Sequence, residues 1–182
     1  NNLQLIASFM QLQINKTDDL HAKDSLEESV KNIQVISLVH ENLYKHSSNL
    51  VNLPNYIQQL SSSIISILNL KNNLKIDVQC ENISLNIDQT IPLGLIINEL
   101  VTNSIKHAFN KKNEQIIVDI QIYRVLDVFH FKYSDNGTKN IVREIEKSNS
   151  GLKLIKMLVQ EVKGIQEIDG QHGFKFHLYF PL

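Results

Sequence analysis

The chain has 182 residues, of which 42% are hydrophobic and 20% are charged, and its formal net charge is −1. This is enough apolar material for one sizeable domain, or for a smaller domain with a helical appendage. The near-neutral charge gives no general attraction to nucleic acid or to anionic membranes. The single cysteine excludes an intrachain disulfide, and no run of 18 apolar residues predicts a membrane span. Because the chain begins with Asn1 rather than Met, we expect it to be a piece of a longer protein.

The first 46 residues contain neither glycine nor proline, and their apolar residues recur at helical spacing. A polar stretch at 15–19 separates two apolar stripes, which predicts a helical hairpin. The stripes are Leu3, Leu5, Ile6, Phe9, Met10 and Leu12, and then Leu26, Val30, Ile33, Ile36, Val39 and Leu43. Because two helices alone leave one side of each stripe in water, we expect a second copy to complete a dimeric four-helix bundle. The alternative is that both helices dock on the rest of this chain.

From about residue 50 onward, three more segments carry apolar residues at helical spacing. Pro54 is expected to open the first of them, whose stripe is Ile57, Leu60, Ile64, Ile67 and Leu68. The second is expected to enter through Pro92, with Asp88 or Thr90 as its N-cap. Gly164 is expected to stop the third, whose apolar residues are Leu154, Ile155, Leu158, Val159 and Val162.

Five segments alternate apolar and polar residues, as half-buried strands do. They are 74–80, 116–122, 129–133, 165–169 and 174–180. The second and third are expected to form a hairpin, and the last two to be joined through Gly170 and Gly173. Because helices and strands interleave without strict alternation, we expect an α+β fold in which the helices and the sheet form a two-layer sandwich.

The helix expected over 92–109 carries the most informative polar residues. At 100° per residue its apolar side chains gather on one side, while Glu99, Asn103 and Lys106 lie together on another. A carboxylate, a carboxamide oxygen and an ammonium group are the side chains that a phosphate–magnesium site uses. The same spacing is also found on an ordinary solvated helix face.

Two further features suit a nucleotide site but are equally common in turns and helix caps. Asp135-Asn136-Gly137 follows a strand, where the carboxylate could accept a hydrogen bond from an exocyclic amine and the glycine would permit close backbone approach. Asn-Gly is also a common tight turn. Ser148 to Leu152 opens a helix whose free N–H groups suit a phosphate, and N-capping explains the same residues.

Taken together and in this order, these segments resemble the ATP-binding domain of histidine kinases, which belongs to the GHKL superfamily with its Bergerat-type fold. The segment 92–109 (PLGLIINELVTNSIKHAF) is similar to the N box and 135–137 (DNG) to the first glycine box. The segment 150–158 (SGLKLIKML) is similar to the second glycine box, and 173–181 (GFKFHLYFP) to the closing strand.

The first 57 residues support a narrower match. The segments NNLQLIASFMQLQ (1–13) and LVHENLYKHSSNLVNLPNYI (38–57) resemble the dimerisation helices and linker of the HisKA_2 subfamily of sensor histidine kinases. The resemblance implies a dimerisation and histidine-phosphotransfer hairpin over 1–49 and a catalytic ATP-binding domain over 50–182. It implies a homodimer through residues 1–46.

The resemblance also implies the roles of individual residues in binding ATP and Mg²⁺. Asn103 would be the magnesium ligand, and Glu99 the catalytic carboxylate beside it. Asp135 would accept a hydrogen bond from the adenine amine. The remaining implied ATP-binding residues are Lys106 and His107 at the phosphates, Gly137 at the base, and Gly151 and Leu152 at the triphosphate end. Residues 138–149 would form a mobile lid.

The subfamily's phosphoacceptor histidine precedes Asn-Asn-Leu-Gln by about one helical turn, so the resemblance places it before Asn1. We therefore expect no phosphoacceptor among the seven histidines of this chain. The resemblance implies a response-regulator receiver domain as partner, a cytoplasmic location, and no nucleic-acid or membrane contact by this chain. It leaves open whether the parent protein is anchored in a membrane.

The first glycine box departs from the family pattern, because Thr138-Lys139 follows Gly137 where the family usually has a second glycine. The leading hypothesis is the core of a two-component sensor kinase, which phosphorylates a histidine on the dimerisation helix for transfer to a response-regulator aspartate. One alternative is a non-catalytic dimerisation and signalling module with a vestigial pocket. Another is a GHKL-type ATPase in which Glu99 activates water.

Overall fold

The computed structural model describes residues 2–19, 50–67, 73–107, 115–137, 151–170 and 173–182, and part of 22–37. The chain divides into two compact units, Asn1–Ser47 and Ser48–Leu182. Within the described residues, no helix has the length and apolar character needed to cross a membrane.

The first unit contains helix α1, Asn2–Ile14, as the apolar spacing predicts. All of the described residues between 22 and 37 are helical as well. The first unit by itself leaves much of the predicted stripe of α1 exposed: Leu5 is 70% and Phe9 68% exposed. The distal part of the second predicted stripe, Ile36, Val39 and Leu43, lies outside the described residues.

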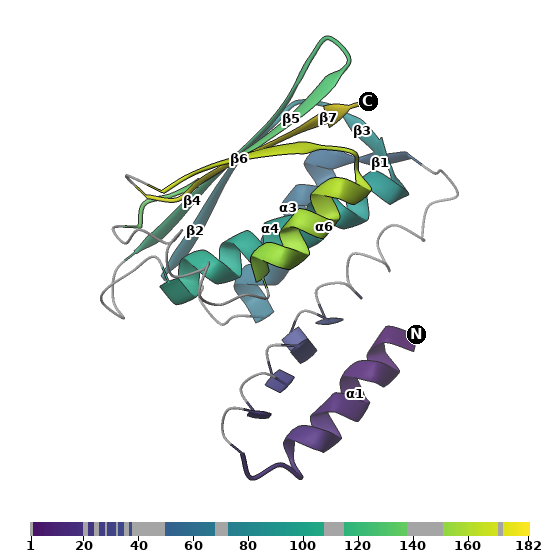
Figure 1. Ribbon diagram of the computed structural model, residues 1–182, viewed down its shortest axis with the longest axis vertical. Coiled ribbons are helices and arrows are strands. Elements are labelled where there is room, and N and C mark those ends of the chain that lie inside the picture. Colours follow the sequence, from purple (N-terminus) through teal and green to yellow (C-terminus); the bar gives the residue numbers. More distant parts are fainter. Residues whose placement is uncertain are drawn as a thin grey trace. The chain divides into compact units, whose positions relative to one another are not determined.

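The second unit is built on a mixed sheet of five strands in the order β2-β4-β5-β7-β6 (Figure 1). The strands are β2 Leu74–Cys80, β4 Ile116–Val125, β5 Val128–Asp135, β6 Ile165–Asp169 and β7 Lys175–Pro181. Strand β2 runs parallel to β4, and the other neighbours in the sheet pair antiparallel. The predicted hairpins β4–β5 and β6–β7 are confirmed. Two short strands, β1 Leu50–Asn52 and β3 Ser84–Asn86, form a separate antiparallel pair.

Three helices cover one face of this sheet, as Figure 1 shows: α3 Leu53–Ile67, α4 Ile87–His107 and α6 Gly151–Glu161. The alternate residues of the strands that face these helices are buried, which is the reason for the alternating pattern in the sequence. The core therefore lies between the helices and the sheet, and its largest fully buried side chains include Phe129, Phe131, Tyr133, Phe176 and Phe180. The predicted two-layer α+β sandwich is confirmed.

Helix α4 begins earlier than predicted. Its first turn is capped by Asn86, whose side-chain Oδ1 accepts a hydrogen bond from the Gln89 N–H at 2.9 Å. Asp88 and Thr90 are therefore inside the helix rather than at its cap, and the Thr90 hydroxyl donates to the Asn86 carbonyl oxygen at 2.7 Å. Pro92 lies within the helix and does not begin it. The prediction of Asp88 or Thr90 as N-cap was wrong because Asn86 supplies the cap.

Helix α6 ends differently from the prediction as well. The left-handed residue after the helix is Lys163, with φ of 54°, and not Gly164. The Gly164 N–H donates to the Val159 carbonyl oxygen at 2.8 Å, which closes the last turn. A Cβ at Gly164 would lie 2.7 Å from Leu178 Cδ1, so this glycine is needed for close packing on β7. Gly164 therefore lies after the turn that ends the helix, and Lys163 is the residue that adopts the left-handed conformation.

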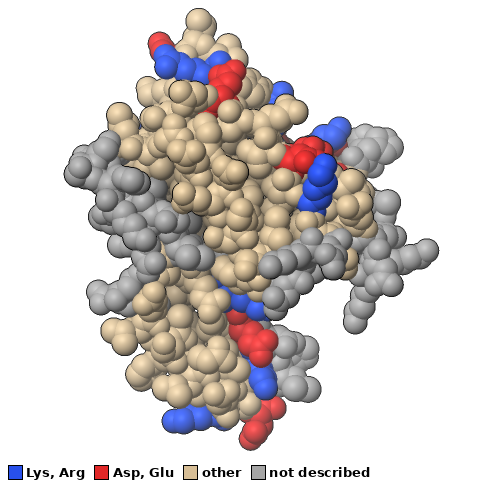
Figure 2. Space-filling view, turned by 180° about the vertical axis from the view of Figure 1, so that it is seen from behind, with Lys and Arg blue, Asp and Glu red and all other residues tan. Residues whose placement is uncertain are grey.

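The described residues carry surface charges of both signs. On the face shown in Figure 2, basic and acidic side chains of the described residues lie next to each other. Independently of this view, the described residues include two exposed ion pairs, Lys75–Asp77 and Arg124–Asp127, each with N···O of 2.7 Å. Exposed pairs of this kind contribute little to stability.

Candidate nucleotide-binding site

Helix α4 presents Glu99 and Asn103 on one line, one helical turn apart. Glu99 is only 7% exposed, which excludes an ordinary solvated helix face at this position. The Asn103 side-chain Nδ2 is buried and has no hydrogen-bond partner within the described part of the chain. A buried amide without a partner is costly, and it is a group that a bound ligand can satisfy. Lys106, one turn further along, is exposed.

The start of α6 lies against these two side chains, and α4 and α6 run side by side in Figure 1. A Cβ built on Gly151 would lie 3.2 Å from Glu99 Oε2 and 3.5 Å from Asn103 Nδ2. The first residue of α6 must therefore be small to leave space in front of the α4 carboxylate and amide. Leu152 follows it and is half-buried.

Asp135 ends strand β5 and is 8% exposed. Its carboxylate Oδ1 accepts hydrogen bonds from the backbone N–H groups of Gly137, at 2.9 Å, and Phe174, at 3.2 Å. The other oxygen, Oδ2, accepts a hydrogen bond from the Ser104 hydroxyl of α4. The turn that brings Phe174 to Asp135 depends on Gly173, whose φ is +74° and where a Cβ would lie 2.4 Å from the Asp135 carbonyl oxygen.

The contact between Ser104 and Asp135 joins the two predicted halves of the site, because Ser104 directly follows Asn103 in the chain. Asn136 is occupied in the turn instead. Its Oδ1 accepts from the Ile117 N–H at 2.8 Å, and its Nδ2 donates to the Gln115 carbonyl oxygen at 3.0 Å. Only the aspartate and the glycine of this triplet are thus available to a ligand.

The structure therefore brings Glu99, Asn103, Asp135, Gly137 and Gly151 into one region of the second unit, through α4, β5 and the start of α6. His107 is the last residue of α4, but its side chain is outside the described residues. The predicted lid, 138–149, is outside them too.

The side chains at this site suit a magnesium ion that is shared with a ligand. Among the described residues, no group of three or more His, Cys, Asp and Glu side chains is placed to hold a metal by itself. Mg²⁺ is typically held by one or two protein oxygens together with substrate phosphates and water. A carboxylate and a carboxamide side by side, Glu99 and Asn103, fit that mode of binding and not a cage made of protein alone.

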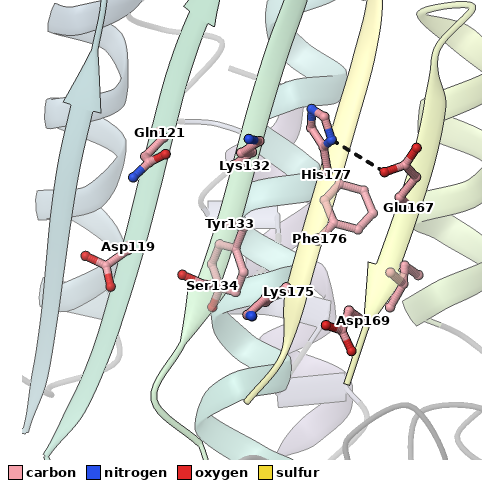
Figure 3. A pocket seen from close by; sticks show the side chains of 11 residues that line it. Asp119, Gln121, Lys132, Tyr133, Ser134, Glu167, Asp169, Lys175, Phe176 and His177 are labelled. Carbon is pink, nitrogen blue, oxygen red and sulfur yellow. Dashed lines mark ion pairs between the residues drawn. The ribbon is translucent and has the colours of Figure 1, made fainter. Parts of the chain in front are cut away.

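A hollow lies on the open face of the sheet, the face away from the helices, and Figure 3 shows its lining. It has a volume of about 480 Å³, and none of the predicted nucleotide-site residues lines it. Glu167 and His177 approach each other across its floor with N···O of 3.7 Å. This hollow was not predicted from the sequence. The signal was present in the outward-facing polar positions of the strands, but only the order of the strands shows which of them become neighbours.

Comparison with known proteins bears directly on these observations. Residues 1–68 match the family model HisKA_2, described as histidine kinase. The chain is also 31% identical over 175 residues to the sensor histidine kinase PdtaS of Mycolicibacterium smegmatis, which covers 95% of this chain and 34% of that protein. The match of residues 1–68 and the similarity over 95% of the chain both point to the HisKA_2 type of histidine kinase. The resemblance inferred from the sequence is confirmed.

Two further relatives extend the comparison. PdtaS of Mycobacterium tuberculosis is 29% identical over 177 residues, or 96% of this chain and 34% of the relative. The chain thus spans about a third of the length of the curated relatives that it matches. Among solved structures, the histidine kinase domain of the blue-light-activated kinase EL346 from Erythrobacter litoralis has a TM-score of 0.72 at 19% identity. That match covers 100% of this chain and 86% of the other, and it supports the histidine-kinase fold.

Proposed function

We propose that this chain is the kinase core of a two-component sensor, and that its second unit binds Mg²⁺–ATP. The observation that carries the proposal is the convergence of three separate segments on one place. Helix α4 brings Glu99 and Asn103, strand β5 brings Asp135, and the glycine start of α6 faces the α4 pair. These are the three segments whose sequences resemble the N box and the two glycine boxes of the family.

Asp135 is proposed as the residue that recognises adenine. Its Oδ1 already accepts two backbone hydrogen bonds, which fixes the plane of the carboxylate. Oδ2 accepts one from Ser104 and retains a lone pair that can accept a hydrogen bond from an exocyclic amine. Gly137, whose N–H helps to hold this carboxylate, would let the base approach the backbone.

The phosphates would lie toward α4 and the start of α6. Asn103 and Glu99 would hold Mg²⁺ together with phosphate oxygens, and the ion when bound would neutralise phosphate charge. Glu99 would orient or deprotonate the attacking group. Lys106 and His107 would approach the phosphates, and Gly151 and Leu152 would close the triphosphate end. Most of the catalytic effect would come from positioning and charge neutralisation.

The first unit is proposed as the dimerisation and phosphotransfer part. Residues 1–49 would form the hairpin and 50–182 the catalytic domain, with the homodimer made through 1–46. The exposed apolar side chains of α1 support an interface of this kind. The phosphoryl group would pass to a histidine of the dimerisation helix, which the resemblance places before Asn1, and then to an aspartate of a response regulator. Because ATP is a cytoplasmic metabolite, we place this core in the cytoplasm.

The altered first glycine box, with Thr138-Lys139 after Gly137, is the specific observation in favour of a vestigial pocket. Calorimetry with ATP in the presence of Mg²⁺, and again with a chelator, separates the two hypotheses. Saturable binding at micromolar to low millimolar ATP, weakened by the chelator, is expected. A folded sample that binds no ATP would contradict the kinase proposal and favour the vestigial module.

A phosphate-release assay on the same sample addresses the ATPase alternative. The kinase proposal predicts almost no steady release of phosphate from this chain. Steady turnover of ATP that is lost on Glu99→Gln would instead show that Glu99 activates water.

A further inference from the structure

Three polar side chains form a line through the core between α4 and β5. The Tyr133 Oη and the Ser104 Oγ lie 2.8 Å apart, and the Ser104 hydroxyl donates to Asp135 Oδ2. Tyr133 and Ser104 are each only 1% exposed. Apolar side chains could fill this space, and buried polar groups are costly unless each has a partner. The presence of this line inside the core therefore calls for an explanation beyond packing.

The direction of each hydrogen bond follows from the chemistry of the groups. An ionised carboxylate only accepts hydrogen bonds, so the Ser104 hydroxyl must use its single hydrogen to donate to Asp135. The bond between Ser104 and Tyr133 must then be donated by the Tyr133 hydroxyl. Burial raises the pKa of Tyr133 far above its ordinary value, which keeps the phenol protonated and able to donate. The hydrogen bonds thus run in one direction: Tyr133 donates to Ser104, and Ser104 donates to Asp135.

This line of hydrogen bonds determines which lone pair of Asp135 is left for a ligand. Oδ1 is occupied by the N–H groups of Gly137 and Phe174, at 2.9 and 3.2 Å. On Oδ2, one lone pair accepts from Ser104. The carboxylate is therefore held on three sides, and the remaining lone pair of Oδ2 has a fixed direction.

We propose that Ser104 and Tyr133 are positioning residues that aim this lone pair, and that they thereby set the preference of the site for a purine bearing an exocyclic amine. The proposal rests on the nucleotide site proposed above and deepens it. Ser104 fixes the carboxylate directly, and Tyr133 acts through Ser104. Neither residue needs to touch the nucleotide.

The test compares ATP with purine riboside triphosphate, an analogue that lacks the exocyclic amine. The readout is the ratio of the two dissociation constants, measured by calorimetry on the whole chain in Mg²⁺. The wild type is expected to prefer ATP by about tenfold, because one hydrogen bond to a charged group is lost with the analogue. Ser104→Ala should reduce this preference to about threefold or less by weakening ATP binding alone. Ser104→Thr, which restores the hydroxyl, should recover it.

Two more variants complete the design. Tyr133→Phe keeps the ring and removes only the donor to Ser104, so it should lower the preference for ATP by a smaller factor, about twofold. Ser61→Ala is the matched control, since Ser61 is a buried serine of α3 outside the site, and it should leave the preference unchanged. Tyr133→Phe also serves as the test if Ser104→Ala does not fold.

The outcomes separate this proposal from the function on which it rests. Equal weakening of both nucleotides by Ser104→Ala, or an unchanged preference in both Ser104→Ala and Tyr133→Phe, would overturn the positioning role and leave the nucleotide site standing. A wild-type chain that is folded and binds neither nucleotide would overturn both.

Discussion

At the scale of single residues, the sheet face away from the helices contains a titratable pair. The rings of His130 and His177 are stacked, and Nδ1 of the first lies 3.1 Å from Nε2 of the second. Burial lowers the pKa of His177 below its ordinary value of 6.5, helped by nearby Lys132 and His130 and opposed by Glu167. His177 therefore takes up a proton less readily in the folded state than in the unfolded chain, where it does so near pH 6.5. The free energy of unfolding consequently falls as the pH drops through that range.

The prediction concerns the pH dependence of unfolding by urea. When the pH is lowered from about 7.5 to about 5.5, the urea concentration at the midpoint of unfolding should fall further for the wild type than for His177→Gln. The reason is that the variant has no proton to take up at this position. The difference between the two pH profiles is the readout, since other groups titrate in both. Parallel profiles would show that His177 does not contribute.

At the scale of elements, the packing of α3 on α4 depends on Gly94. A Cβ at this position would lie 1.9 Å from the Tyr56 hydroxyl oxygen and 3.1 Å from Cζ. Tyr56 is buried, and its hydroxyl donates to the Thr90 carbonyl oxygen at 3.4 Å. The two helices thus pack closely because Gly94 of α4 has no side chain where the large Tyr56 side chain of α3 lies.

Gly94→Ala should therefore destabilise the second unit, by about 1–3 kcal/mol, through overpacking. Adding Tyr56→Phe removes the clashing oxygen and should restore part of that loss, although each change alone is destabilising. The measurement is a double-mutant cycle of unfolding free energies. Simple additivity of the two losses would contradict the contact.

The elements themselves were largely predictable from the sequence, and their ends were not. Alternation located the five strands of the main sheet, and helical spacing located α3, α4 and α6, because one face of each is buried. The short strands β1 and β3 were not predicted. The cap at Asn86 and the left-handed Lys163 were missed, since several neighbouring residues could play either role and only backbone geometry selects one. The link from Tyr133 through Ser104 to Asp135 was also missed, because it depends on how β5 lies under α4.

At the scale of the whole molecule, α1 presents an apolar surface that its own unit leaves exposed. Leu5 and Phe9 lie one turn apart, and both are about two-thirds exposed or more. Surfaces of this kind are typical of sites where proteins associate. This arrangement supports the homodimer proposed above.

The corresponding prediction is tested by analytical ultracentrifugation over a range of concentrations. The wild type should sediment as a dimer at micromolar concentration, and Leu5→Glu or Phe9→Glu should weaken association by at least about tenfold. Met157→Glu is the matched control, because Met157 is 66% exposed on α6 of the second unit. Equal behaviour of all three variants would contradict an interface made by α1.

The most direct test of the central claim, the nucleotide site, is calorimetry of ATP binding in Mg²⁺ with three matched variants. Asp135→Asn keeps an oxygen for the Gly137 and Phe174 N–H groups but replaces the acceptor for the adenine amine, and Asn103→Ala removes the proposed magnesium ligand. Each should weaken ATP binding by at least about tenfold. Asp127→Asn, in the exposed turn between β4 and β5, should bind as the wild type does. Unchanged affinity in both site variants would contradict the account.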